Sequence, residues 1–364
     1  MRDIPAIWAQ AVEWTWTDRN LLGSAEQLVL SARVIDINGS ATNGIGYDVG
    51  GKVIVPEFLR PAQTLQFSLD ALKQSLVAYD QTAETAGMTL TRNLSKVWTA
   101  SVGITTTQET VNQPEEASFF SPLQSNFDYT LFALPVTLRY DSTGVDSPLV
   151  DPLHGMRVAV TVAPTLSLGP PDATFVISQV RASAYLDLNH LIGTAPGRSV
   201  VAVRGLYGYA QGAAKVTSLP PDQRFYAGGS GTIRGYRFQS AGPQFSMAET
   251  PAGVPQGEPQ GGLAVQAASL ELRQRVGRNY GFAVFADGGR VYGGRTDPIA
   301  VPGAPAPAPP PPNGYQFGAG VGIRYYTPIG PLRLDLAFPM ESSNERRLRN
   351  DDRLEVYIGL GPAF

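Results

Sequence analysis

The chain has 364 residues, with 28 Lys and Arg against 31 Asp and Glu and a formal net charge of −3. It contains no Cys, which excludes disulfide bridges and thiolate metal sites. The slight acidity argues against a nucleic-acid-binding protein, which would present a basic face to phosphate groups. This length fits either two ordinary domains or one large all-β unit.

The first residues do not resemble a signal peptide. Met1 to Pro5 are followed by neither an apolar core of the required length nor a small-residue cleavage site. Two interpretations remain: the protein is cytoplasmic, or the chain lacks its natural N-terminus.

Alternation of apolar with polar or small residues is the main pattern along the chain, and it is typical of β-strands. The alternation is clear at 96–106, 127–140 and 156–166. No amphipathic helix is predicted between such segments. In chain order, the predicted strands are 8–17, 25–37, 46–56, 62–72, 76–92, 95–107, 127–141, 154–166, 173–188, 198–211, 263–276, 280–292, 314–326, 330–338 and 353–363.

The predicted strands are longer than the five or six residues that are usual in soluble proteins. Tilted strands of about 9–11 residues are what a bilayer requires. Two all-β interpretations therefore compete, a soluble sandwich and a transmembrane antiparallel β-barrel. Aromatic residues at strand ends favour the barrel, because such side chains are typical of membrane interfaces. They are Trp14, Trp16, Tyr207, Tyr209, Tyr325 and Tyr326.

Connections in the C-terminal half alternate between long and short. The long ones are 212–262, 293–313 and 339–352, and the short ones are 277–279 and 327–329. Outer-membrane barrels have long external loops and short periplasmic turns, so the chain is predicted to end on the periplasmic side. The loop 293–313 is rich in Pro, which cannot pair in a sheet. We interpret it as a solvated external spacer rather than as a ligand for a proline-reading domain.

An odd number of strands conflicts with the even counts of bacterial single-chain barrels. Either a closing strand before residue 8 is missing, or one predicted strand is really two. The segment 76–92 is long enough to be such a pair. We favour the missing strand, since the absent signal peptide also indicates a lost N-terminus. The complete barrel would then have about sixteen strands.

The loop 212–262 contains a Gly-rich stretch from Arg224 to Tyr236. A phosphate-binding loop would need a preceding strand, a following helix and usually a Lys, and none is present. The two histidines, His154 and His190, have no Ser or acidic partner at motif spacing. The sequence therefore predicts no enzyme, no metal site and no cofactor.

Within this loop, Ile233-Arg234-Gly235-Tyr236 resembles the Val-Arg-Gly-Phe/Tyr signature of the outer-membrane assembly and two-partner-secretion (BamA-TamA, or bacterial surface antigen) superfamily. The resemblance is strong over 198–364 and diffuse but collinear over 8–197. The segments most similar to the TamA branch are 224–236, 239–243, 318–339 and 358–364.

The resemblance implies that the loop 212–262 folds into the barrel lumen and that Arg234 meets acidic side chains on the inner wall. The matching acids are Glu271 and Asp287. The residue pattern agrees, because both acids alternate with apolar neighbours, and a carboxylate that faces lipid is costly. Two carboxylates on adjacent strands suit a guanidinium group. Without the resemblance, the same acids would be interpreted as the lining of a wet lumen.

The last strand has an apolar residue at every second position and ends in Phe364. The resemblance implies a C-terminal signal for outer-membrane assembly, carried by Tyr357, Leu360 and Phe364. An ordinary last strand fits the same pattern. Arg333 and Asp335 are predicted to face inward and to line the wall.

Residues 1–364 are thus expected to form the barrel domain of a TamA-type assembly factor of the bacterial outer membrane. Such a factor would insert or translocate clients such as autotransporters by opening laterally between its first and last strands. Implied partners are outer-membrane lipid, client proteins and an inner-membrane TamB-like protein, but not nucleic acid. Family members carry POTRA domains before the barrel, and none is recognised in this sequence.

Two alternatives remain open for the function. The first is a two-partner-secretion transporter for one dedicated exoprotein. The second is a passive porin-like channel, which would lack the inserted Arg234 loop and would conduct small solutes steadily.

Overall fold

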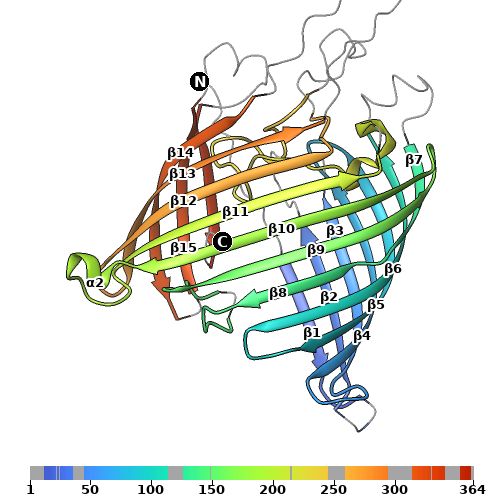
Figure 1. The fold of residues 1–364 in the computed structure, drawn as a ribbon, viewed down its shortest axis with the longest axis horizontal. Helices are drawn as coiled ribbons and strands as arrows, with labels where there is room; N and C mark the ends of the chain where they lie inside the picture. The colour runs from blue at the N-terminus through green and yellow to red at the C-terminus, as the bar shows by residue number, and fades with distance from the viewer. Residues whose placement is uncertain are drawn as a thin grey trace, which may run out of the picture.

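The protein's structure, a computed structural model, describes residues 12–35, 45–113, 126–244, 259–293, 314–340 and 353–361, apart from residues 22, 24, 148, 214 and 329. Sixteen strands form one antiparallel sheet, which confirms the predicted all-β fold. Figure 1 shows the strands strongly tilted and the sheet curling on itself. The strands are β1 (Val12–Asp18), β2 (Gln27–Ile35), β3 (Gly46–Val55), β4 (Gln63–Ser75), β5 (Asp80–Asn93), β6 (Trp98–Asn112), β7 (Asn126–Ala133), β8 (Val136–Asp141), β9 (Gly155–Leu168), β10 (Ala173–Asp187), β11 (Ser199–Gln211), β12 (Ala264–Val276), β13 (Tyr280–Tyr292), β14 (Gln316–Thr327), β15 (Gly330–Pro339) and β16 (Glu355–Leu360).

The predicted strand 127–141 is divided into β7 and β8 at Leu134 and Pro135. Pro has no N–H group to donate to a ladder, so the regular pairing stops there. The two pieces nevertheless lie end to end between β6 and β9. Across the break, the Gly103 N–H donates to the Pro135 carbonyl (2.8 Å) and the Leu134 N–H donates to the Pro164 carbonyl (3.0 Å). The path across the sheet from β1 to β16 is therefore fifteen strands wide.

The segment 76–92 is not a merged pair of strands, so that interpretation is wrong. Residues 76–79 form a tight turn, in which the Leu76 N–H donates to the Tyr79 carbonyl (2.9 Å). The strand β5 begins only at Asp80 and continues unbroken to Asn93. The expected strand before residue 8 lies outside the described residues.

The two faces of the sheet differ in polarity, as the alternating sequence predicts. In β13, the side chains of Phe282 and Val284 are about half exposed (53% and 52%), whereas Ala283 and Phe285 are buried. We call the face with exposed apolar side chains the outer face and the opposite one the inner face. Exposed apolar side chains on almost every strand make the outer face one continuous apolar surface.

Aromatic pairs mark the end of the sheet at which β6 and β13 begin. The rings of Trp98 and Tyr140 lie 4.9 Å apart, and those of Tyr280 and Tyr325 lie 5.3 Å apart. Tyr326 differs from the expectation, because it is half-buried and the Arg275 guanidinium lies 4.0 Å from its ring centroid.

Helices are few and short in the part of the chain that the structure describes. They are α2 (Asn189–Ile192) and the 3-10 helices η1 (Val216–Ser218) and η2 (Pro221–Gln223). No helix among the described residues combines the length and the apolar character needed to cross a membrane. Most of the Pro-rich loop (294–313) lies outside the described residues.

The largest buried apolar cluster joins the loop after β11 to the inner face of the sheet. From the loop it includes Leu219, Ile233 and Tyr236, which are almost fully buried. From the sheet it includes Phe175 and Val265. Burying one such large apolar side chain contributes about 1.5–3 kcal/mol, so this cluster holds the loop against the inner face.

Candidate functional site

The two described parts of the loop, 212–244 and 259–262, are paired with each other by backbone contacts. Phe225 and Gly262 exchange two backbone hydrogen bonds of 2.9 Å, and Gln244 forms a bridge with Pro259. The loop therefore leaves and re-enters the sheet at one place, between β11 and β12. The Ile233–Tyr236 motif lies between these two ties.

Arg234 of the motif makes the densest set of polar contacts in the described structure, and its side chain is only 1% exposed. Its Nε and Nη2 donate to the two carboxylate oxygens of Asp287 on β13, at 2.7 and 2.9 Å. Its Nη1 donates to Glu271 on β12, at 2.8 Å. The guanidinium also lies over the ring of Phe285, 3.4 Å from its centroid. Such bidentate, charge-assisted contacts are among the strongest hydrogen bonds in proteins.

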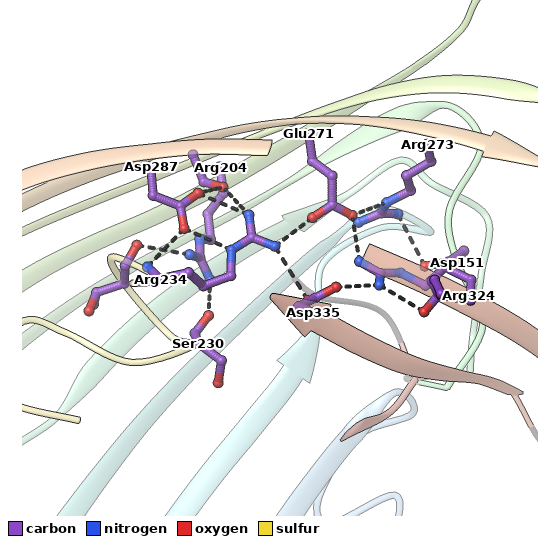
Figure 2. A network of polar contacts seen from close by, with 12 residues as sticks. Asp151, Arg204, Ser230, Arg234, Glu271, Arg273, Asp287, Arg324 and Asp335 are labelled. Atoms are coloured by element: carbon purple, nitrogen blue, oxygen red, sulfur yellow. Dashed lines mark hydrogen bonds and ion pairs between the residues drawn. The ribbon is translucent and has the colours of Figure 1, made fainter. Parts of the chain in front are cut away.

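Further charged residues extend this centre along the inner face (Figure 2). Glu271, fully buried, also accepts from Arg273 at 2.8 Å and from Arg324 at 3.4 Å. Arg324 forms an ion pair with Asp335, which lies 3.6 Å from Arg234. We call this set the arginine network. Its members are Arg234, Arg273 and Arg324 with Asp151, Glu271, Asp287 and Asp335.

The strand register explains why these side chains meet. Ser269 of β12 lies opposite Asp287 of β13, and the Ser269 hydroxyl donates to that carboxylate at 2.5 Å. Glu271 is two residues further along β12, on the same face. Because side chains of one face repeat every second residue, one guanidinium can reach both carboxylates. The cost of burying these charges is offset only because each is paired.

Glycine allows the loop backbone to approach the sheet at two positions. Gly235 has φ of +99°, and a Cβ there would lie 2.8 Å from the backbone of Phe338. A Cβ on Gly318 would lie 1.8 Å from the Arg234 carbonyl oxygen. Any larger residue at either position would push the motif away from β14 and β15.

The other motif residues also contact the sheet. The Tyr236 hydroxyl donates to the Phe317 carbonyl at 3.2 Å, and Ile233 is fully buried in the apolar cluster. Tyr357 of β16 accepts from the Gly235 N–H at 3.1 Å and donates to the Tyr236 carbonyl at 2.9 Å. The motif is thereby bound to the last described strand.

A second buried arginine holds the start of the loop. Arg224 is 5% exposed, and its Nη2 and Nε donate to the Leu219 carbonyl at 2.8 and 3.0 Å. Its Nη1 donates at 2.9 Å to the amide oxygen of Gln113, which follows β6. Gln113 in turn donates to the Ala78 carbonyl at 2.9 Å. This chain of hydrogen bonds ties the loop to the far side of the sheet.

The residues named from the sequence divide into three groups. Arg234, Glu271 and Asp287 lie together, with Ile233, Gly235 and Tyr236 beside them. Leu360 faces outward and is 43% exposed, whereas Tyr357 points the other way, toward the loop. Phe364 lies outside the described residues.

Sequence reasoning missed the remaining members of the arginine network. Asp335 was interpreted only as part of the lining of the barrel wall, and no role was given to Arg273 or Arg324. A signal was present, because each alternates with outward apolar residues; Arg273 follows Leu272, and Arg324 follows Ile323. Alternation identifies the face of a strand but not which strands bring their inward charges together.

Comparison with known proteins identifies the fold. A model of the Omp85 superfamily domain matches residues 20–364. Among solved structures, BamA from Haemophilus ducreyi lacking POTRA domains 1–3 is similar with a TM-score of 0.72 and 19% identity, covering 95% of this chain and 66% of that one.

Two further structures are similar. CdiB from Acinetobacter baumannii has a TM-score of 0.57 and 15% identity, covering 95% of this chain and 55% of its own. CdiB from Escherichia coli has a TM-score of 0.55 and 12% identity, covering 96% and 58%. The chain thus spans between about half and two thirds of the length of the structures it matches.

Proposed function

Because the chain belongs to the Omp85 superfamily, we propose that it inserts client proteins into the outer membrane or secretes them across it. The chain is an outer-membrane protein of Gram-negative bacteria. Its sheet is the transmembrane β-barrel that the sequence predicts, and its outer apolar face is the lipid-facing surface. The observation that carries the proposal is the superfamily match over residues 20–364 together with the Arg234 motif at the inner face.

In more detail, we propose a TamA-type factor whose loop occupies the barrel lumen and whose clients are autotransporter-like proteins. The motifs around Arg234 and in 318–339 support this branch of the superfamily. An inner-membrane TamB-like protein would be its partner.

The mechanism would use the two ends of the sheet. The path of paired strands begins at β1 and ends at β16, with no ladder between these two among the described residues. An unpaired strand edge in lipid leaves N–H and C=O groups without partners, which is costly. A client strand that pairs with such an edge would relieve this cost, and the client would enter the membrane sideways.

Photo-cross-linking can test this mechanism. A photoreactive phenylalanine analogue would replace Trp16 of β1 or Ile358 of β16, both exposed on the outer face (44% and 52%). The matched control is Phe282 of β13, which is exposed to a similar extent (53%) but lies inside the sheet path. We expect an unfolded autotransporter barrel to cross-link at the end strands and not at Phe282 during assembly in proteoliposomes.

Other results would favour the alternatives. Equal cross-linking at all three positions, or none with any client, would contradict lateral entry. Steady conductance of small solutes without client assembly would indicate a passive channel. Assembly limited to one secreted exoprotein would indicate a two-partner-secretion transporter.

A further inference from the structure

A cavity of about 620 Å³ lies between the inner face of the sheet and the loop. Strands β8 to β11 form one wall, and loop residues between Tyr226 and Gln239 form the other. Four arginines line it, Arg139, Arg157, Arg181 and Arg204, against a single carboxylate, Asp141. The whole chain carries a net charge of −3, so this concentration of positive charge is local.

The register places the four arginines in two adjacent rows across the sheet. Ala159 of β9 lies opposite both Arg139 of β8 and Arg181 of β10. Strands are about 4.8 Å apart, so the backbones of these two arginines are about 10 Å apart, with only a small side chain between them. In the next row, Arg157 and Arg204 flank Ser183 of β10.

Two of these arginines already have partners. Arg157 forms an ion pair with Asp141 at 2.9 Å, and Arg204 donates to the Thr232 carbonyl of the loop at 3.2 Å. Arg139 and Arg181 are exposed, and neither forms an ion pair with any carboxylate in the part of the chain that the structure describes. Like charges gathered in a cleft repel one another and attract an anion.

The loop wall adds apolar character to this charged wall. The Phe238 side chain is 48% exposed, and Tyr226 lies in the same lining. At Gly231, a Cβ would meet no atom within 4 Å, so the backbone there borders open space. A ligand that fits both walls carries carboxylates and apolar groups together. The ligand is not a lipid of the surrounding membrane, because these arginines face away from the outer apolar face.

We propose that this cavity binds an extended client segment in which two carboxylates are two residues apart, at positions i and i+2, with an apolar residue between them. Side chains at i and i+2 of an extended chain point to the same side and lie about 6.6 Å apart, so both carboxylates can face Arg139 and Arg181 while the residue between them faces the loop wall. The cavity volume lies in the range of about 300–1,000 Å³ that is usual for ligand sites. This inference rests on the proposed function, since it assigns the chemistry of the client segment.

Peptide binding to the purified full chain in detergent tests the proposal. The probe is a short peptide with two Glu separated by one apolar residue, labelled with a neutral dye, and its partner probe has Gln in place of both Glu. We expect fluorescence anisotropy to report binding of the Glu peptide that weakens at high salt, because salt screens exposed charges. The double variant Arg139→Gln/Arg181→Gln should bind it about tenfold more weakly or worse.

Two controls separate the site from general charge effects. Arg60→Gln/Arg92→Gln removes two exposed arginines outside the cavity and should leave binding unchanged. Arg139→Lys/Arg181→Lys keeps the charge and should retain most of the affinity. Equal binding of the Glu peptide by all variants, equal binding of the Gln peptide, or binding of anionic lipid vesicles but not of the Glu peptide would overturn the proposal.

The client assay distinguishes this inference from the proposed function. If clients assemble but the Glu peptide does not bind, the cavity assignment is wrong and the proposed function stands. If the Glu peptide binds through Arg139 and Arg181 but no client assembles, the proposed function is wrong and the cavity is still an acidic-peptide site.

Discussion

At the scale of single residues, Arg234 connects parts of the chain that are far apart in sequence. Its guanidinium binds Asp287 of β13 and Glu271 of β12, and its backbone N–H donates to Asp287 at 2.9 Å. Removing one partner of a buried ion pair costs about 3–5 kcal/mol, because the remaining charge is left without compensation. The strand ladders do not pass through Arg234, so this cost falls on the position of the loop.

We therefore predict that Arg234→Ala lowers client assembly about tenfold or more while the barrel still folds. Arg234→Lys should give an intermediate loss, since an ammonium group cannot bind Asp287 with two parallel hydrogen bonds. Assembly per folded molecule would be measured with heat-modifiable gel mobility as the folding readout. Loss of folding with unchanged activity per folded molecule would contradict this role.

At the scale of the element, the loop is held at several points by side chains that act together. Arg224 fastens its start to Gln113 after β6, Arg234 fastens its middle to β12 and β13, and Tyr357 of β16 holds the backbone at Gly235. The loop thus contacts both halves of the sheet. The Arg234 motif is thereby in direct contact with the last described strand.

The packing of the loop around Asp222 of η2 is expected to depend on pH. Burial raises the pKa of Asp222 in η2, and its Oδ1 has no hydrogen-bond donor among the described residues. The nearby charged or titratable groups are Glu109 of β6, Tyr79 and Arg224. An acid whose pKa is raised by folding stabilises the folded form below its ordinary pKa of about 3.9, and this contribution is lost as pH rises through the raised value.

Acidification should therefore tighten the loop, and Asp222→Asn should weaken this dependence, because the amide never ionises while Glu109 remains titratable. Hydrogen exchange of the amides of residues 225–236, corrected for the intrinsic effect of pH, would measure it. Asp146→Asn, which neutralises an exposed acid elsewhere, is the matched control. The same pH slope in the wild type and in Asp222→Asn would rule out Asp222 as its source.

At the scale of the whole molecule, stability depends on an outer face that meets lipid along its full height. Leu270, at the middle of β12, is 53% exposed there, and Val276, at the end of the same strand, is 46% exposed. Charge on this face is costly at the centre of the bilayer and nearly neutral at its edge. The depth of a residue in the bilayer, rather than its exposed fraction, should therefore decide how much a charged substitution destabilises the folded protein.

Leu270→Arg is predicted to destabilise the folded protein by about 2–4 kcal/mol and Val276→Arg by about 0–1 kcal/mol. Denaturant unfolding in lipid vesicles would compare them. Equal effects of the two substitutions would show that β12 does not span the bilayer as the outer face indicates.

Much of the architecture could be predicted from sequence because a strand in a barrel has only two environments. Alternation along 280–292 already separates Phe282 and Val284 from Asp287, and the structure agrees. The division at Pro135 was missed, since the residues on both sides keep the same alternation and only the missing N–H interrupts the ladder.

The sequence by itself determined the all-β fold and the face to which each strand residue points, and the resemblance to a known superfamily implied the pairing of Arg234 with two named acids. Alternation with a period of two is a local property, so the sequence of each strand shows which of its residues lie on which face of the sheet. Only the tertiary structure decided that Arg273, Arg324 and Asp335 join the same network, that Tyr357 contacts the motif, and that Arg139 and Arg181 share a cavity. These associations depend on strand register and on the path of the loop, which bring together residues that no spacing along the chain relates.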